Sequence, residues 1–180
     1  MVVVLLVSIG SRIAINQIKG TMNLMDADVA ANTVSSQIQF ARQVAIDQRR
    51  NVQIEFVGDN EVKVTRQDQG GATTVMSDVT LPSGYTFAFP AGIADTPDGF
   101  LSGSSLYASI GTAGKAVFIG AGTTGIFIGD GTFVDNSNVL LNGDVFTKGP
   151  GNQTARAVTL TAATGRVKQY WVSGGNWVRR

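Results

Sequence analysis

The sequence of 180 residues contains no cysteine and no histidine. Without cysteine the chain can form neither a disulfide framework nor a zinc site built on thiolates. Without histidine it also lacks the side chain that most often serves as general acid or base near neutral pH and as metal ligand. Only 15% of the residues are charged, whereas glycine occurs 22 times. We therefore expect no enzyme activity and no cofactor, and one glycine-rich domain with an appendage.

Acidic residues are present but lie in places where they have an ordinary explanation. Five aspartates, the candidates for a carboxylate pair or a calcium site, fall in turn-like segments where aspartate is common. They are Asp95, Asp98, Asp130, Asp135 and Asp144. The stretch GDGTFVDNSN lacks the alternating ligand spacing of an EF-hand loop. We expect no metal site, although the sequence alone leaves calcium binding open.

The net charge of +1 hides an uneven distribution along the chain. Residues 51–144 contain ten acidic and three basic residues, whereas residues 145–180 contain six basic residues and no acid. The C-terminal part also holds Tyr170, Trp171 and Trp177 among its cations. Such an imbalance can mark a surface for an anionic partner, or simply a solvated end of the chain.

The first fifty residues contain no proline and only two glycines, Gly10 and Gly20, so nothing firmly ends a helix there. Small and aliphatic residues recur at a spacing of three or four, which predicts a helix with one apolar face from Ala27 to Ala45. We expect Phe40 and Val44 to widen that face and Gly20 to be the weakest point. A continuous helix over 1–50 would be about 75 Å long, so 1–21 would project outward while 22–50 packs on the rest. The residues expected at the helix–sheet contact are Val34, Ile38, Ala41 and Ala45.

Beyond Arg50 the apolar period changes to two, which is typical of strands. Residues 52–64 predict a hairpin with a turn at Gly58-Asp59-Asn60, and Thr164-Gly165 predicts a second tight turn. The other expected strands are 85–89, 116–119, 125–128, 139–141, 157–161 and 166–172. A helix followed by strands indicates an α+β fold, with a helix over 1–50 packed on a small antiparallel sheet domain over 51–180.

The chain opens with the apolar run MVVVLLVSIG. A helix needs about 20 apolar residues to cross the hydrocarbon core of a bilayer, so this run is too short to span one alone and too apolar to stay in water. We expect 1–21 to be buried in a membrane or among other helices, with its cation pairing or lying at the edge of the apolar part. The residues expected there are Met1, Val4, Leu5, Leu6, Ile9 and Arg12.

Three segments, in this order, resemble the family that contains the H-type minor pseudopilin of type II secretion and the FimT-like minor pilins. The helix AANTVSSQIQFARQVAIDQRRNVQIEF resembles theirs in its Ala-Arg pair, here Ala41 and Arg42, followed by a further alanine and a basic pair. The segment FIGDGTFVD, around residues 129–131, resembles a Phe-x-x-x-Gly strand and turn of the family. The segment ARAVTLTAATGRVKQY resembles its final hairpin, with Gly165 and Arg166 at the turn.

The resemblance implies a pilin-like structural subunit, held in the bacterial inner membrane by one helix, with its head in the periplasm or on an extracellular filament. Its partners would be other pilin or pseudopilin subunits and, in secretion, an exported protein cargo. In the family, prepilin peptidase removes a short basic leader and the new N-terminus is methylated. No leader, cleavage glycine or glutamate precedes MVVVLL here, so we interpret Met1 as an internal methionine and expect processing only if a longer precursor exists.

Two alternatives remain open. FimT-like relatives are linked to DNA uptake, and cations interleaved with aromatic residues could pair with phosphates and stack on bases. The residues that would bind DNA are Arg166, Lys168, Arg179 and Arg180. The other alternative is a membrane-tethered adhesin domain, which the Gly- and Thr-rich strands suggest.

Overall fold

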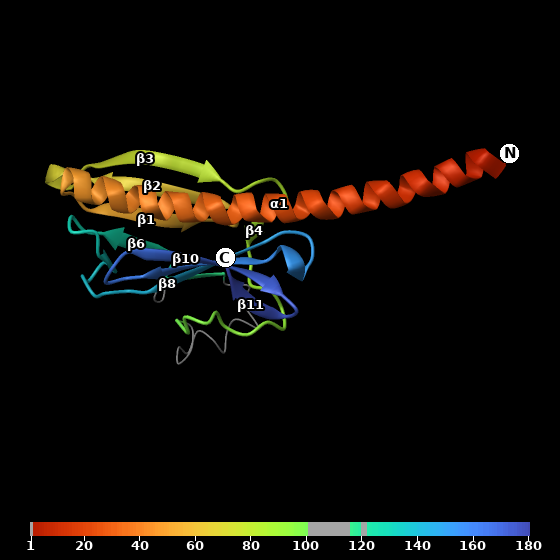
Figure 1. Cartoon of the computed structure of the whole chain (residues 1–180). Helices are drawn as coiled ribbons and strands as arrows, with labels where there is room; N and C mark the ends of the chain where they lie inside the picture. The colour runs from red at the N-terminus through yellow and green to blue at the C-terminus, as the bar shows by residue number, and fades with distance from the viewer. Residues whose placement is uncertain (1, 101–115, 120–121) are drawn as a thin grey trace.

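The computed structural model describes residues 2–100, 116–119 and 122–180, with residues 2–18 and 118 described by their backbone alone. Helix α1 runs from Val2 to Gln48 and continues through Gly20 without a break. Its 47 residues span about 70 Å, and its N-terminal part projects well beyond the head (Figure 1). The helix ends where Arg49 takes a left-handed conformation with φ 50°. A long helix followed by antiparallel strands confirms the α+β prediction.

The strands follow α1 in chain order and form two antiparallel sheets. The first sheet contains β1 (Val52–Val57), β2 (Glu61–Gln67), β3 (Thr73–Thr80), β6 (Thr124–Phe127) and β7 (Phe133–Val134), in the order β3-β2-β1-β6-β7. The second sheet contains β4 (Thr86–Phe87), β8 (Gly143–Lys148), β9 (Arg156–Thr161), β10 (Arg166–Ser173) and β11 (Asn176–Arg179). Their order is β11-β10-β9-β8-β4, and β5 (Val117–Ile119) also pairs with β8. Two short 3-10 turns, η1 (Gln69–Gly71) and η2 (Asn152–Thr154), lie between strands.

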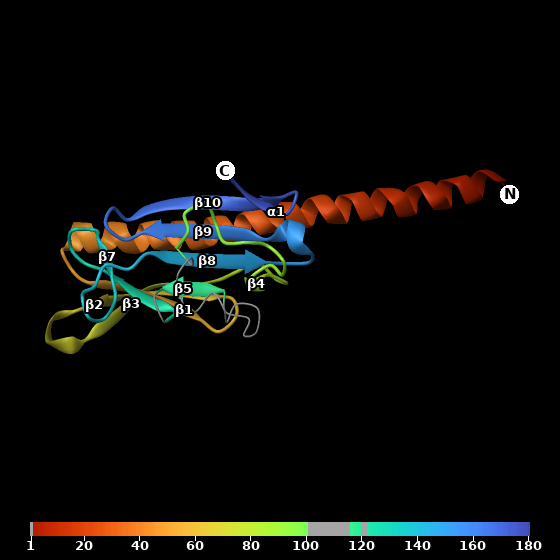
Figure 2. The ribbon, with the colours of Figure 1, turned by 90° about the horizontal axis from the view of Figure 1, so that it is seen from below.

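Helix α1 contacts both sheets and forms the central element of the head. In the two views it runs along β1 and β2 on one side and along β9 and β10 on the other (Figures 1 and 2). Its inner face consists largely of alanine, which lets the helix approach the sheets closely. The buried residues of this face are Ala27, Ala30, Ala31, Val34, Ile38, Ala41 and Ala45, each no more than 2% exposed.

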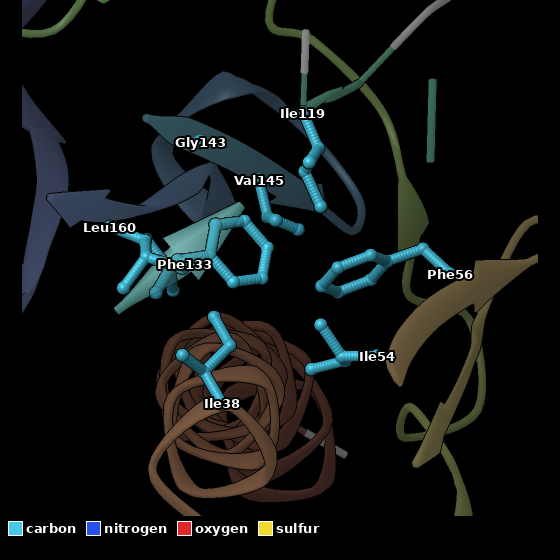
Figure 3. A pocket seen from close by; sticks show the side chains of 9 residues that line it. Ile38, Ile54, Phe56, Ile119, Phe133, Gly143, Val145 and Leu160 are labelled. Atoms are coloured by element: carbon cyan, nitrogen blue, oxygen red, sulfur yellow. The ribbon is translucent and has the colours of Figure 1, made fainter. Parts of the chain in front are cut away.

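The core lies where the helix meets the two sheets, and Figure 3 shows its centre, with Ile38 of α1 facing Ile54 and Phe56 of β1. The space between these side chains is a cavity of about 10 Å³ with an almost wholly apolar lining. A cavity of this size is at the limit for one water molecule and offers it no set of polar partners. It is therefore a packing defect and not a ligand site.

Three sequence-based expectations about local structure are wrong. Asp144 lies within β8 and is buried, not in a turn. Residues 139–141 form no strand: after a turn, Leu140 makes only an isolated bridge to Val134. Val139 and Leu140 are more than half exposed, because Asp135 accepts hydrogen bonds from Ser137 and Val139 and closes a tight turn at this position. The strand lies just beyond it, as β8. Phe40 does not widen the buried face of α1, since its side chain is 38% exposed.

Candidate functional site: the projecting helix and its attachments

A group of directional polar contacts holds α1 at the point where it leaves the head. The Tyr85 hydroxyl donates to the carbonyl of Asn23. Arg156 of β9 pairs through Nε with the Asp28 carboxylate at 2.7 Å, and its Nη2 approaches the carbonyl of Leu24 at 3.5 Å. The Arg156 side chain is only 7% exposed, so this pair is poorly screened by solvent. The clamp, defined as these contacts of Tyr85 and Arg156 with residues 23–28, fixes the base of the projecting segment.

The C-terminal end of the chain strengthens the clamp. Arg180 lies 3.3 Å from Asp28, which therefore bridges two guanidinium groups. The backbone N–H of Arg180 donates to Gln169 of β10, and the Gln169 side chain donates to Asn32 one helical turn beyond Asp28. The end of the β10–β11 hairpin is thus tied to the same turn of α1 as Arg156.

Arg42 attaches the other end of the amphipathic helix. Its Nε donates to the carbonyl of Gly131 at 3.2 Å, and its side chain passes over Gly165 in the β9–β10 turn. Gly165 has φ +61°, and a Cβ placed on it would lie 2.2 Å from Arg42 Nε, so the turn requires glycine for two reasons. The three segments that carry the family resemblance therefore meet at one place, around the Arg42 guanidinium.

The outward face of α1 carries an apolar stripe. Met22, Met25 and Val29 are 57%, 64% and 50% exposed, and Phe40 lies on the same side two turns beyond Thr33. From Met22 to Phe40 the stripe extends about 27 Å along the helix axis. Met22, Met25 and Val29 are neighbours on this side, whereas Thr33 and Ser36 separate Val29 from Phe40. Neighbouring exposed apolar residues, rather than ones scattered singly, are typical of a surface that binds another element.

The structure gives only the backbone of the segment expected to be buried in a membrane or filament. The side chains of Val4, Leu5, Leu6, Ile9 and Arg12 lie outside what is described, as does Met1 altogether. Their backbone from residue 2 onward is helical and continuous with the rest of α1. Within the described residues, no helix combines the length and the hydropathy that a membrane crossing requires.

Three of the four cations predicted as a DNA-binding set, Arg166, Lys168 and Arg179, lie on one face of the β10–β11 hairpin, whereas Arg180 reaches Asp28 of α1. Lys168 forms an ion pair with Asp98, and Arg180 forms one with Asp28. Arg166 is exposed at the turn next to Arg42, and Arg179 is the cross-strand partner of Tyr170, four residues along β10 from Arg166. Of the aromatic residues among them, Tyr170 and Trp177 are buried, and Trp171 is 40% exposed.

Segment 88–100 covers the face of the second sheet that points away from α1. Trp177 donates through Nε1 to the carbonyl of Ala94 at 2.8 Å. Asp98 accepts from Thr159 at 2.6 Å, from Tyr170 at 2.9 Å and from Lys168. Burial raises the pKa of Asp98, but these three donors together hold it below its usual range. Burial, with the hydrogen bond to Asp98, raises the pKa of Tyr170 to about 12.

Asp144 of β8 lies beneath this segment, directly across from Thr159 in the β8–β9 register. Its side chain is fully buried, and neither carboxylate oxygen has a hydrogen-bond partner among the described residues. Burial raises the pKa of Asp144 to about 8, and the nearby carboxylates of Asp95 and Asp98 add to the effect. The carboxyl is therefore largely protonated at neutral pH. The described residues contain no group of acidic side chains arranged to hold a metal ion.

Sequence reasoning found Asp28 and Tyr85 only as members of a helix or strand and Arg156 only as one of the C-terminal cations, and gave them no role. A clamp of this kind leaves no local signal, since residues that contact each other in it are separated by up to 132 residues. Arg42 was singled out through the resemblance, but its hydrogen bond to Gly131 was not foreseen.

Comparison with solved structures places this arrangement in the pilin-like fold. The type IV minor pilin FimU of Pseudomonas aeruginosa is similar with a TM-score of 0.51 and 14% identity, over 83% of this chain and 90% of that chain. The minor pseudopilin EpsH from the type II secretion system of Vibrio cholerae is similar with a TM-score of 0.50 and 10% identity, over 81% of this chain and 97% of that one. A scan against protein-family models and a sequence search of characterised proteins find no match.

Proposed function

We propose that the chain is a minor pilin-like subunit of a type II secretion pseudopilus or a type IV pilus. In this role it is a structural protein and not an enzyme, anchored in the bacterial inner membrane by the N-terminal part of α1, with its head in the periplasm or on the filament. The observation that supports this most strongly is the continuous helix, which extends about 30 Å beyond the clamp at residues 23–28. A helix of that length needs a bilayer or neighbouring helices around it to bury its apolar residues.

Assembly would transfer the projecting helix from lipid into a bundle of helices from other subunits. Such a transfer gains little hydrophobic energy, because lipid tails and apolar side chains are similar environments. Specific packing must then decide the position of the subunit. The exposed stripe of Met22, Met25, Val29 and Phe40 continues the projecting segment onto the head and would extend the contact. Prepilin peptidase and N-methylation would act on a longer precursor, if one exists.

The absence of cysteine from the chain offers a direct test, since each introduced cysteine is unique. We would introduce Met22→Cys and Val29→Cys, both on the exposed stripe, and produce each variant in cells that assemble pilin-like filaments from partner subunits carrying cysteines in their helices. Disulfide cross-links to those subunits are expected from both positions. Asp59→Cys is the matched control, because Asp59 is also exposed but lies in the β1–β2 turn.

Removal of residues 2–21 should abolish cross-linking at both positions while leaving the head folded, as judged by circular dichroism. If the complete chain forms no cross-links and does not co-purify with filaments, the filament proposal is wrong and the adhesin alternative becomes the better one. The identity of the cross-linked subunits would also separate a secretion pseudopilus from a pilus.

The DNA-uptake alternative rests on the exposed cations Arg166 and Arg179 and on exposed Trp171. In this alternative DNA either binds without Lys168 and Arg180 or displaces Asp98 and Asp28, the carboxylates with which they are paired. Titration of the chain with labelled DNA at several salt concentrations tests it. Binding that weakens with salt and disappears when Arg166 and Arg179 are alanines would favour DNA uptake.

A further inference from the structure

Methionine carries all the sulfur of this chain. The sequence contains four methionines and no cysteine, so no thiol competes with the thioethers for an oxidant. Three of the methionines lie where the structure describes side chains, Met22 and Met25 on α1 and Met76 on β3. Met22 and Met25 are more than half exposed, whereas Met76 is partly buried and packs against the core. An oxidant in solution therefore reaches the two helical methionines more easily than Met76.

Met22 and Met25 lie together on the outward side of α1. They are three residues apart, a spacing that makes side chains neighbours on the surface of a helix. Val29, one turn beyond Met25, is also exposed. The buried residues of α1 include alanine, valine and isoleucine but no methionine. Both thioethers thus belong to the stripe proposed to contact other subunits, and neither belongs to the core of the head.

Oxidation would make this surface polar. Hydrogen peroxide converts a methionine thioether to the sulfoxide by transferring one oxygen atom: the sulfur loses two electrons, the O–O bond breaks, and the peroxide is reduced to water. The product carries a polar S=O group on a side chain that was apolar. Buried in a contact between helices, each S=O group would need a hydrogen-bond donor, which an apolar partner surface does not offer.

We infer that Met22 and Met25 form an oxidation site that controls whether the subunit can enter a filament. The inference rests on the proposed function, because it takes the stripe as a contact with helices of other subunits. In the reduced state both thioethers are flexible apolar side chains, which adapt well to a packing partner. In the oxidised state the stripe is polar at both positions, and the subunit stays unassembled. Neighbouring subunits cover both sulfur atoms once assembly is complete, so the site responds to oxidant before assembly.

The modification is reversible. A methionine sulfoxide reductase returns the sulfoxide to the thioether, while two thiols are oxidised to a disulfide and one water is released. Neither Met22 nor Met25 packs in the core, so the head stays folded in both states. A subunit that has been oxidised and then reduced is therefore competent for assembly again.

The first part of the test maps the modification. The full chain is treated with dilute hydrogen peroxide, and peptide mass spectrometry follows Met22, Met25 and Met76 in the same sample. We expect sulfoxide at Met22 and Met25 before Met76 in the folded chain, and equal rates in urea, where all three are exposed. Equal rates in the folded chain would overturn the inference, because the helical pair would then not be a distinct site.

The second part measures assembly, as the fraction of the chain that co-purifies with filaments of partner subunits from cells given peroxide before assembly is induced. The wild-type fraction should fall in proportion to the sulfoxide content at Met22 and Met25. Met22→Leu with Met25→Leu keeps the stripe apolar without a thioether, so its fraction should not fall. Met76→Leu is the matched control and should respond like the wild type. Met22→Gln with Met25→Gln makes both positions polar and should be excluded from filaments without peroxide.

The outcomes separate this inference from the proposed function. A wild-type chain that enters filaments equally well after peroxide overturns the inference and leaves the proposed function intact. Equal losses from the wild type and from the chain with Met22→Leu and Met25→Leu do the same, because the oxidised group then lies elsewhere. Normal assembly of the chain with Met22→Gln and Met25→Gln also overturns the inference. A wild-type chain absent from filaments without peroxide overturns both.

Discussion

Replacement of Asp144 by asparagine should stabilise the protein at neutral pH. The Asp144 carboxyl is fully buried without a hydrogen-bond partner among the described residues, and burial raises its pKa to about 8. The folded state must therefore take up a proton that the unfolded state does not hold. Asparagine has nearly the same shape and is neutral at every pH, so it removes the need for that proton while burying a similar number of polar atoms.

The magnitude follows from the two pKa values. In the unfolded chain an aspartate has a pKa of about 3.9, so it is ionised at pH 7. For each pH unit above about 3.9, protonation of the carboxyl on folding costs about 1.4 kcal/mol of stability. With the folded pKa at about 8, the penalty at pH 7 is about 4 kcal/mol. Because the folded state binds more protons, the stability from this group falls as pH rises from about 4 to about 8 and is constant above that.

Urea unfolding of the full chain and of the Asp144→Asn chain, at pH values between about 4 and about 9, measures this difference. The variant should match the wild type near pH 4 and exceed it by about 2 to 4 kcal/mol near pH 7. Slopes that come from other carboxyl groups, Asp98 included, are common to both chains and cancel in the difference. Asp59→Asn, at an exposed turn, should show no pH-dependent difference. If Asp144→Asn destabilises the protein equally at all pH values, Asp144 is ionised and paired, and the reasoning is refuted.

Three further changes test the attachments of α1 by urea unfolding. Gly165→Ala should cost more than about 2 kcal/mol, since positive φ alone costs about 1 to 2 kcal/mol and the new Cβ displaces Arg42. Gly174→Ala has a similar φ of +58° but open space around it, so it should show the conformational cost alone; equal losses would mean that Arg42 yields freely. Arg156→Ala should cost about 1.5 to 3 kcal/mol by removing the charge-assisted hydrogen bond to Asp28, which keeps Arg180 as its second partner. Arg180→Ala should cost less than about 1 kcal/mol, because the Arg180 side chain is exposed where it pairs with Asp28. A larger loss would show that the Arg180–Asp28 pair contributes most of the stability of the clamp.

The helix and its buried face were predictable because the signal is long and regular. The apolar residues from Ala27 to Ala45 repeat at helical spacing, and no proline interrupts them. The β1–β2 hairpin was equally clear, since Val52, Ile54 and Phe56 alternate with more exposed residues. In both cases one face is buried and the other is not, and this contrast is what a periodic pattern records.

The missed strands lack that contrast. Five of the six residues of β8 are buried on both faces, and one of them is Asp144, so the segment shows neither alternation nor an apolar run. β3 lies at the edge of the first sheet, is largely exposed, and has a register shift opposite Val64 and Thr65. The strand over 139–141 was predicted from the apolar residues Val139 and Leu140. Both are exposed in a turn, because the hydrogen bonds of Asp135, and not hydropathy, decide their position.

The difference between apolar burial and directional hydrogen bonds also explains why α1 needs polar attachments in addition to its buried face. Alanine side chains allow close approach but interdigitate little, so they resist sliding along the helix axis weakly. A slip of one turn, about 5.4 Å, would put Ala31 in the place of Ala27 and Ala45 in the place of Ala41. It would also separate Asp28 from Arg156 and leave a buried guanidinium without its carboxylate. The clamp therefore sets the axial position of the head, which a subunit pulled or pushed through its helix must keep.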